Sequence, residues 1–479
     1  MLAIQIGLLS WLLYTAIGDG HFFLAHDDEV INYCAAKLYD ETGSVRAEGC
    51  ITEDVSPIGQ MNWYGPGYYF VYGSLRTLFG DHSTLFIQLH FAFALLAVLL
   101  IYFLPGKSEN KLLIANALVF TWQFTGYIFT WFPETLNLLM AILMILLVVG
   151  IKKAENHKYK NYLTFIFIGV VLTFALCRVT IIFWLAALIG LSTTKREVVK
   201  TTIIFGTGLL LTLVYMKYFT APPYAGEMQK IGRLYKFDMI QFVLRTGWAL
   251  LRNTWFLIIN FSMPVYFLLG LMGLAAFQWW KSRDRLLMAA LLVSLLLVAA
   301  LMAYYSPDPW YFLKQSDALI PLLLMALMLS DTSLKIKYGI VMVAIMSFIF
   351  SFQKVMNTIH ERREAYGWLE EHKSFQASLQ QVPAFIDEEG PVTILWCYNE
   401  YAFGGVAEAL LPFSTRHHKP ILYTSNIVDP AEKSEVKFQR HHKIQVDYIL
   451  SRLPIGWPEL EEVHASGFYH LYKIIDNKK

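Results

Sequence analysis

Three consecutive carboxylates stand just beyond the first apolar run of the chain, in the stretch His26-Asp27-Asp28-Glu29. Ionisable groups at the edge of a bilayer usually face a water-filled cavity and take part in binding or chemistry. A carboxylate in such a cavity can accept the proton of an attacking hydroxyl or amine. Two plainer explanations stand beside this one: an acidic loop in solvent, and a helix start, where the positive end of the helix dipole stabilises carboxylates.

Three further ionisable residues lie in or beside apolar segments. Arg178 stands between FALC and VTIIFW, so it should have an anionic partner. Glu134 follows Pro133, where a helix start would explain an acid without any chemistry. Lys314 lies in YYSPDPWYFLKQSDALIP, and either it snorkels to an aromatic belt that includes Tyr305 or it contacts a ligand.

These residue types together suit the transfer of a group from a phosphate-bearing lipid. Arg and Lys can neutralise the phosphate as it leaves, while a carboxylate accepts the proton of the attacking group. The cations and the carboxylate would act on opposite sides of the transferred carbon. A single displacement of this kind inverts the configuration at that carbon, unlike the two-step mechanism of retaining glycosidases.

The composition is that of a polytopic membrane protein. The chain has 479 residues, of which 56% are hydrophobic and 16% charged, and its mean hydropathy is +0.44; soluble domains are about a quarter charged. The net charge of +2, without a Lys/Arg-rich run interleaved with aromatics, gives no indication of nucleic-acid binding. Cys34 and Cys50 could form a disulfide in an extracytoplasmic loop, or could be two buried thiols.

Apolar stretches predict about 11 transmembrane helices, since roughly 20 residues cross a bilayer. The two stretches beside Arg178 are short, so they are either half-length or tilted helices that meet there or one long helix. The predicted spans are 1–18, 84–104, 111–130, 134–150, 162–177, 179–192, 200–219, 253–277, 286–304, 316–330 and 337–352.

Lys and Arg gather in alternate connections between these spans, which predicts that those connections are cytoplasmic. The acidic stretch, Glu134, Arg178, Lys314 and the C-terminal tail then lie on the extracytoplasmic side, outside the cell (inner) membrane. The basic residues are Lys107 and Lys111; Lys152, Lys153, Lys158 and Lys160; Lys195, Arg196 and Lys200; Lys281, Arg283 and Arg285; and Lys335 and Lys337.

Two domains are predicted. Residues 1–353 form a transmembrane domain whose first outer loop, 19–83, carries amphipathic helices at Asp28–Thr42 and Gly67–Phe79. Residues 354–479 form a small extracytoplasmic α/β domain that opens with a charged helix at 354–381. Its predicted strands are 392–397, 421–424, 446–451 and 468–475, and its predicted helices are 401–411 and 430–441.

HDDEVINYCAAKLYDETG, followed by YGPGYYFVYGSLRTLFG and a span, resembles the start of the C-type (GT-C) glycosyltransferases, specifically the protein O-mannosyltransferase and aminoarabinose transferase group. That group has an Asp-Glu pair that opens a helix after the first span, a Pro before an aromatic-rich amphipathic helix, and a basic residue before a Pro-containing late span. Asp28-Glu29, Pro66 and Lys314 with Pro321 fill those places. The predicted topology is also similar to that of the group.

The resemblance implies a polyprenyl- or dolichyl-phosphate-linked sugar donor, a protein, lipid or glycan acceptor, and Asp28 in the catalytic position. Whether Asp27 shares that role is open. Glu29 and Glu134 would orient donor or acceptor, while Arg178 and Lys314 would hold phosphate.

Further candidates come from the same comparison. Tyr64 stands where the family pattern often has a basic residue or His, and it is counted with Tyr305 among the candidate substrate contacts. Some relatives need a divalent cation and others do not, and the His-Asp-Asp-Glu string could ligate one, so the metal requirement is open.

Two functions of other classes compete with a glycosyltransferase. A transporter or lipid flippase would line its path with the acids and Arg178, although the chain shows no repeat between its halves and its charges gather at one face. A non-catalytic scaffold that presents the C-terminal domain would tolerate loss of every acid named above.

Overall fold

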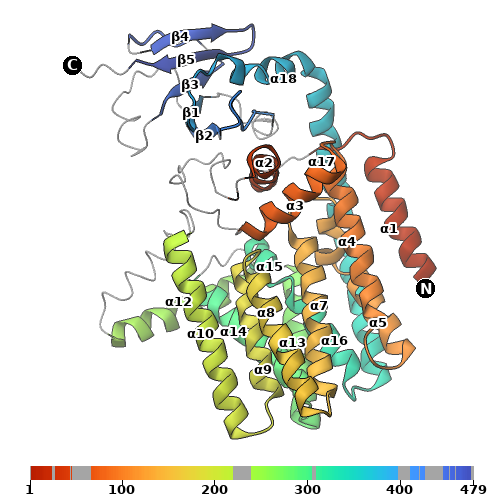
Figure 1. The fold of residues 1–479 in the computed structure, drawn as a ribbon. Coiled ribbons are helices and arrows are strands. Elements are labelled where there is room, and N and C mark those ends of the chain that lie inside the picture. Colours follow the sequence, from red (N-terminus) through yellow and green to blue (C-terminus); the bar gives the residue numbers. More distant parts are fainter. Residues whose placement is uncertain are drawn as a thin grey trace. The chain divides into compact units, whose positions relative to one another are not determined.

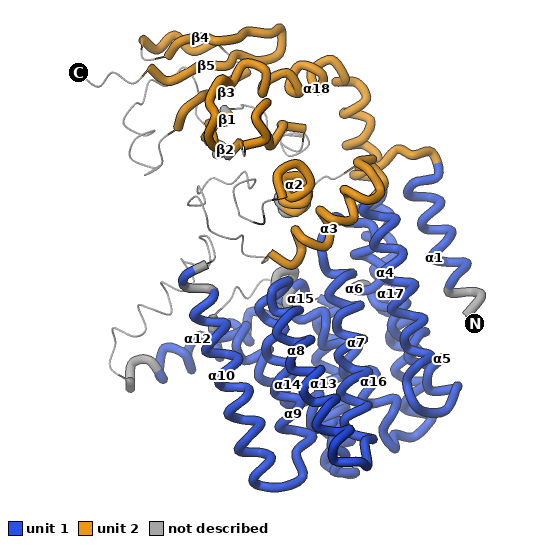
Figure 2. Tube along the Cα trace, in the orientation of Figure 1, with its two compact units in different colours: residues 1–18, 86–218, 226–359 blue, residues 19–85, 219–225, 360–479 orange. Residues whose placement is uncertain are grey.

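The computed structural model describes residues 2–23, 27–43, 45, 66–219, 239–260, 262–304, 309–397, 410–419, 421–426, 446–452, 454–458 and 460–475. The chain forms two compact units (Figure 2). Unit 1 comprises residues 1–18, 86–218 and 226–359, and unit 2 comprises residues 19–85, 219–225 and 360–479. The predicted boundary after residue 353 falls inside one continuous helix, α17 (Leu334–Glu371), and the predicted outer loop groups with the C-terminal residues in unit 2.

The described part of unit 1 is helical (Figure 1). Its elements are α1 (Leu2–Ile17), α4 (Leu85–Ile101), α5 (Ser108–Val119), α6 (Trp122–Ile128), α7 (Glu134–Lys153), α8 (His157–Ala175), η2 (Val179–Leu185), α9 (Ala186–Leu191), α10 (Lys195–Phe219), α12 (Met239–Ile259), α13 (Met263–Ser282), α14 (Arg285–Tyr304), α15 (Pro309–Ser316), α16 (Leu319–Leu329) and the first part of α17.

Among the described residues, five helices are long and apolar enough to cross a membrane, namely α7, α10, α13, α14 and α17. Shorter apolar helices are found in α1, α4, η2 with α9, and α16. The chain is therefore a multi-pass integral membrane protein, and the count of about 11 spans stays a prediction.

Helix α16 lies at the centre of unit 1. It is apolar along its whole length, and its residues from Leu319 to Met328 are buried against α5, α7, α13 and α14. A helix that is apolar all round is expected to be surrounded by other helices. Helix α9 also packs closely on α14. A Cβ atom added at Gly190 would lie 2.5 Å from the Ala289 backbone.

The basic connections of unit 1 meet at one end of its bundle. Side-chain contacts of 2.8, 3.2 and 3.1 Å join, in turn, Lys152 to Asp284, Lys160 to Glu197, and Lys337 to Asn110. Helix α7 begins at Glu134 and reaches these connections at its other end. Its 20 residues span about 30 Å, so Glu134 lies at the opposite end of the bundle.

Two predicted spans are wrong in their boundaries. The span 111–130 is broken into α5 and α6 around Phe120 and Thr121. The span 253–277 covers the end of α12, at Ile259, and most of α13, which begins at Met263. Pro264 stands in the first turn of α13, where a residue without an N–H is tolerated, so it begins a helix there instead of continuing one.

Unit 2 contains both predicted amphipathic helices, α2 (Asp27–Thr42) and α3 (Pro66–Phe79). Each ends at a glycine with positive φ, Gly43 at 69° and Gly80 at 79°, a conformation that glycine adopts without a steric penalty. The C-terminal part of α17 also belongs to unit 2. It is followed by α18 (Lys373–Leu379), by η3 (Val382–Phe385) and then by a β-sheet.

The sheet has five strands in the order β2-β1-β3-β5-β4. Strand β1 (Val392–Cys397) pairs in parallel with β2 (Ile421–Asn426) and β3 (Tyr448–Ser451), whereas β5 (His470–Ile474) runs antiparallel to β3 and to β4 (Leu460–Ala465). The small C-terminal sheet is thus confirmed, and β4 is an addition to the predicted strands. The predicted helix 430–441 and most of 401–411 lie outside the described residues.

Candidate functional site

Glu134 and Arg178 form a buried ion pair in unit 1. Arg178 Nη2 lies 2.7 Å from Glu134 Oε1, and the two side chains are 5% and 0% exposed. The anionic partner expected for Arg178 is therefore Glu134, which stands in the first turn of α7. Burial makes the pair costly to break, because either partner alone would be an uncompensated charge.

A break in the helical chain carries Arg178. Helix α8 ends before it, η2 begins after it, and Arg178 itself has an extended backbone with φ −145° and ψ 116°. The sequence predicted either one long helix or two helices that meet at Arg178. The structure has two helical segments that meet there. The extended residue places the guanidinium at the junction between the 19-residue α8 and the shorter η2 and α9.

Lys314 joins the same cluster from α15. The Arg178 guanidinium donates a hydrogen bond to the Lys314 backbone carbonyl, and Lys314 Nζ lies 3.9 Å from the ring centroid of Phe132. The Lys314 side chain is 2% exposed, so it does not reach the surface of the described structure. A cation over an aromatic face in a desolvated site is attracted by the ring quadrupole.

Asp317, just beyond α15, adds a second acid to the cluster. Its Oδ1 accepts a hydrogen bond of 2.7 Å from the Ala318 N–H, and its buried carboxyl interacts electrostatically with Arg178 and Glu134. The cluster thus holds two cations, Arg178 and Lys314, and two acids, Glu134 and Asp317. An incoming phosphate would have to compete with these two acids for the cations.

Aromatic side chains lie beside the cluster. Tyr127 is fully buried and lies within electrostatic reach of Glu134 and Asp317. Trp131, next to Phe132, stacks on Phe86 with ring centroids 3.5 Å apart. Glu134, Arg178 and Lys314 are themselves buried, which strengthens the interactions among their charges.

The acidic stretch begins α2 in unit 2. Asp27 and Asp28 are the first two residues of the helix, and Glu29 follows with its side chain fully buried. Glu29 Oε1 lies 2.6 Å from Nη2 and 3.1 Å from Nε of Arg362 in α17, itself 1% exposed. Glu29 thus holds the start of α2 against α17.

The segment that leads to α2 is held by the same part of α17. The Phe23 N–H donates to the Arg362 carbonyl at 3.1 Å, Asp19 pairs with Arg363, and the His21 ring stacks on Tyr366 at 4.9 Å. The chain is therefore fixed just before the acidic stretch as well as within it.

Further along, α2 is clamped on two more sides. Arg76 of α3 is 3.1 Å from Asp40 and 2.6 Å from Asp81. Lys37 Nζ donates to the Leu411 carbonyl at 2.8 Å, and burial lowers the pKa of Lys37 despite its nearby Glu41. A helix held along its whole length gives its first turn a defined position.

The predicted site residues thus fall into two groups. Glu134, Arg178 and Lys314 come together in unit 1, and Asp27, Asp28 and Glu29 follow one another at the start of α2 in unit 2. Tyr64, Tyr305, His26 and Cys50 lie outside the described residues, as do the side chains of Asp27 and Asp28. The Cys34–Cys50 disulfide therefore stays a prediction, with Cys34 buried in α2.

Within the described residues, no group of three or more His, Cys, Asp or Glu side chains is arranged to hold a metal ion. His26 and the carboxylates of Asp27 and Asp28 lie outside the described residues. A divalent cation at the acidic stretch therefore stays an open alternative of the sequence analysis.

Sequence reasoning missed two members of these clusters. Asp317 follows Lys314 by three residues in an apolar segment, and a second ionisable residue at that spacing was an available signal. Arg362 lies in the charged run HERREAYGW, where nothing distinguishes it from its neighbours. Only the packing shows that the Arg362 side chain is buried, whereas that of Arg363 is 39% exposed.

Known families and proteins were compared with the chain. No family model matches the sequence, and no curated protein matches it. The structure is similar to that of the oligosaccharyltransferase of Archaeoglobus fulgidus, solved in complex with zinc and sulfate, with a TM-score of 0.52 and 11% identity over 94% of this chain and 68% of that one.

A second solved structure is similar over nearly its whole length. ArnT from Cupriavidus metallidurans bound to undecaprenyl phosphate gives a TM-score of 0.50 and 10% identity, over 98% of this chain and 97% of that one. The chain therefore has the GT-C fold, as the resemblance of its opening residues predicts.

Proposed function

We propose that this chain is a membrane glycosyltransferase that moves a sugar from a polyprenyl- or dolichyl-phosphate-linked donor to a protein, lipid or glycan acceptor. One observation carries the proposal: a chain with the GT-C fold has Arg178, Glu134 and Lys314 buried together at the end of its bundle opposite the basic connections. The undecaprenyl phosphate bound to ArnT, which shares the fold, supports a lipid-phosphate donor.

The site lies on the non-cytoplasmic face of the cell (inner) membrane, together with the C-terminal domain. The support for this orientation is the gathering of Lys and Arg at the other end of the bundle, because cytoplasmic connections are the basic ones. A lipid-linked donor would place its phosphate at the membrane surface, within reach of cations at a helix end.

In this mechanism Asp28 accepts the proton of the acceptor hydroxyl or amine as that atom attacks the anomeric carbon. The bond from that carbon to the phosphate oxygen breaks, and the electron pair leaves with the lipid phosphate. Arg178 and Lys314 neutralise the growing charge on the phosphate, exchanging contacts with Glu134 and Asp317. One displacement gives inversion at the sugar.

The remaining residues position the reactants. Glu29, through Arg362, fixes the turn that carries Asp28 and Asp27, and Asp27 is the second candidate for the base. Glu134 sets the direction of the Arg178 guanidinium. Tyr64 and Tyr305 are proposed substrate contacts.

The experiment is transfer of labelled sugar from lipid-phosphate donors in membranes that carry Asp28→Asn. General-base catalysis contributes about 10²- to 10⁴-fold, so transfer should fall by that factor while the protein still inserts and accumulates. Asp27→Asn tests whether the role is shared, and Glu53→Gln removes an acid of the same outer loop as the control. Undiminished transfer by Asp28→Asn would remove Asp28 from the mechanism, and movement of labelled lipid without sugar transfer would favour a flippase.

A further inference from the structure

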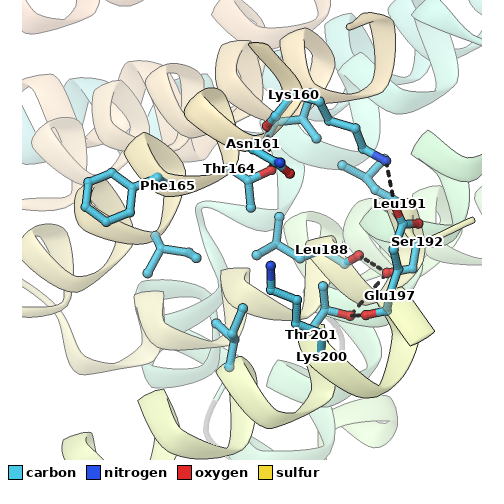
Figure 3. Close-up of a pocket in the computed structure, with 13 residues that line it drawn as sticks. Lys160, Asn161, Thr164, Phe165, Leu188, Leu191, Ser192, Glu197, Lys200 and Thr201 are labelled. Carbon is cyan, nitrogen blue, oxygen red and sulfur yellow. Dashed lines mark hydrogen bonds and ion pairs between the residues drawn. The ribbon is translucent and has the colours of Figure 1, made fainter. Parts of the chain in front are cut away.

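A second candidate site lies in unit 1 among the basic connections, away from Glu134 and Arg178. A cavity of about 430 Å³ opens between α8, α9 and α10 (Figure 3). Its lining changes from charged and hydroxyl side chains near the helix ends to apolar ones along the helices. A cavity with one polar and one apolar part fits an amphiphile.

Lys160, Glu197 and Lys200 form the charged part. Lys160 Nζ lies 3.2 Å from Glu197 Oε1, and Glu197 also accepts bonds of 2.6 and 2.7 Å from the N–H and hydroxyl of Thr193. Glu197 is therefore fully engaged. Lys200 extends into the cavity (Figure 3), and no acid among the described residues forms an ion pair with it.

The charge around this part is positive. Lys160 and Glu197 cancel, which leaves Lys200, and Lys195 and Arg196 line an adjoining apolar hollow with it on the first turns of α10. The amide of Asn161 also lines the cavity, whereas the hydroxyls of Ser192, Thr201 and Thr164 each donate to a backbone carbonyl one turn back. This combination matches a phosphodiester, which carries one negative charge and several acceptor oxygens.

The apolar part is open to the surroundings of the bundle. Phe165 on α8 lines it and is 77% exposed, and Ile203 on α10, in the adjoining hollow, is 63% exposed. Only 6% of the membrane-crossing window of α10 is buried within the protein. An occupant could therefore extend acyl chains along Phe165, Ile168 and Ile204 into the bilayer.

We infer that this cavity binds an anionic phospholipid, with its phosphate at Lys200 and its acyl chains along α8 and α10. Basic pockets between membrane helices at a positively charged face are the kind that bind anionic headgroups. Lys200 has no acidic ion-pair partner among the described residues, so its charge favours a lipid with a net negative charge over a zwitterionic lipid. The site is independent of the proposed transfer reaction, because it lies among the connections at the other end of α7.

The test uses the purified full-length chain in neutral detergent, with phosphatidylglycerol or phosphatidylcholine of identical acyl chains counted on the intact protein by native mass spectrometry. Each lysine near an anionic surface is worth about a fivefold change in binding. Lys200→Gln should therefore weaken retention of phosphatidylglycerol about fivefold and leave phosphatidylcholine unchanged. Lys335→Gln is the matched control, an exposed lysine in another basic connection.

Two further arms separate the parts of the site. Ile204→Trp, which fills the apolar wall, should reduce phosphatidylglycerol retention without changing any charge. Inorganic phosphate at the same concentration should not displace the lipid, because it has no chains to bury. Equal retention of both lipids by the unmodified chain, an equal loss in Lys335→Gln, or displacement by inorganic phosphate would each overturn the inference.

Discussion

Two buried Arg–Glu pairs with nearly the same geometry stand in the two units. Arg178 and Glu134 are 2.7 Å apart in unit 1, and Arg362 and Glu29 are 2.6 Å apart in unit 2. All four side chains are 5% exposed or less. Buried pairs of this kind are weak evidence for net stability, because desolvation offsets much of the attraction.

Their surroundings differ. The pair in unit 1 has a second cation, Lys314, which lies over the Phe132 ring, and a second acid, Asp317. The Arg362 backbone, by contrast, also accepts a bond from Phe23, and Glu29 belongs to a helix that is clamped elsewhere. The difference suggests chemistry for the first pair and positioning for the second.

The largest expected effect tests whether the pair in unit 1 takes part in the reaction. Replacing both Arg178 and Glu134 by Leu removes the ions together, so the protein should still accumulate, since apolar replacements of buried pairs are often neutral. Transfer should nevertheless fall by about 10²- to 10³-fold, the usual cost of losing a transition-state charge contact. Initial rates per folded protein measure this, and full activity of the double variant would make the pair purely structural.

The second prediction concerns the pair in unit 2. Arg362→Leu alone leaves Glu29 buried without its cation and should destabilise the protein by about 3–5 kcal/mol. Adding Glu29→Leu should recover most of that stability and restore transfer per folded molecule. Thermal unfolding and transfer assays on the singles and the double form the cycle. If the double is stable yet inactive, Glu29 takes part in the reaction itself.

A third prediction tests whether the position of α2 matters. Gly73 of α3 faces Tyr39 of α2 so closely that a Cβ atom would lie 2.4 Å from Tyr39 Cδ1. Gly73→Ala should therefore cost about 1–3 kcal/mol through overpacking, with a smaller loss of transfer than Asp28→Asn. Tyr39→Gly removes the ring and also the Tyr39 Cβ atom, which would lie 2.7 Å from the new Cβ, so the costs of the two substitutions should be less than additive in the double variant. Fully additive costs would mean that the helices do not meet there.

The smallest expected effect is a pH dependence in the sheet. Burial raises the pKa of Glu388, but bonds from Lys473 at 2.8 Å and Tyr448 at 2.5 Å outweigh it, so the net pKa is lowered. The stabilisation is thus present above the unfolded value of about 4.5 and is lost as pH falls through the folded pKa.

Hydrogen exchange of β3 and β5 in the full chain measures that loss, which should be below about 1 kcal/mol for a partly exposed pair. Glu388→Gln should remove the dependence between pH 7 and acid conditions. An unchanged profile in that variant would assign the dependence to another group.

Local signals explain what could be predicted. The ends of α2 and α3 follow from Gly43, Pro66 and Gly80, because caps and breakers act within a few residues. The break at Arg178 was one of two predicted arrangements, since a charge between short apolar stretches interrupts their pattern. The end of α12 at Ile259 and the start of α13 at Met263 were missed because the apolar run continues across them. Strand β4, LEEVHA, was missed because its edge position leaves it polar.

By itself the sequence determined that this chain is a membrane protein, where most of its helices begin and end, and which opening residues resemble the GT-C group. It also required that Arg178 have an anionic partner. Only the tertiary structure decided which partner, because Glu134 is 44 residues away, and it alone joined Glu29 to Arg362 across 333 residues. Pairing over such distances depends on how whole helices pack, and no periodicity within either segment encodes that choice.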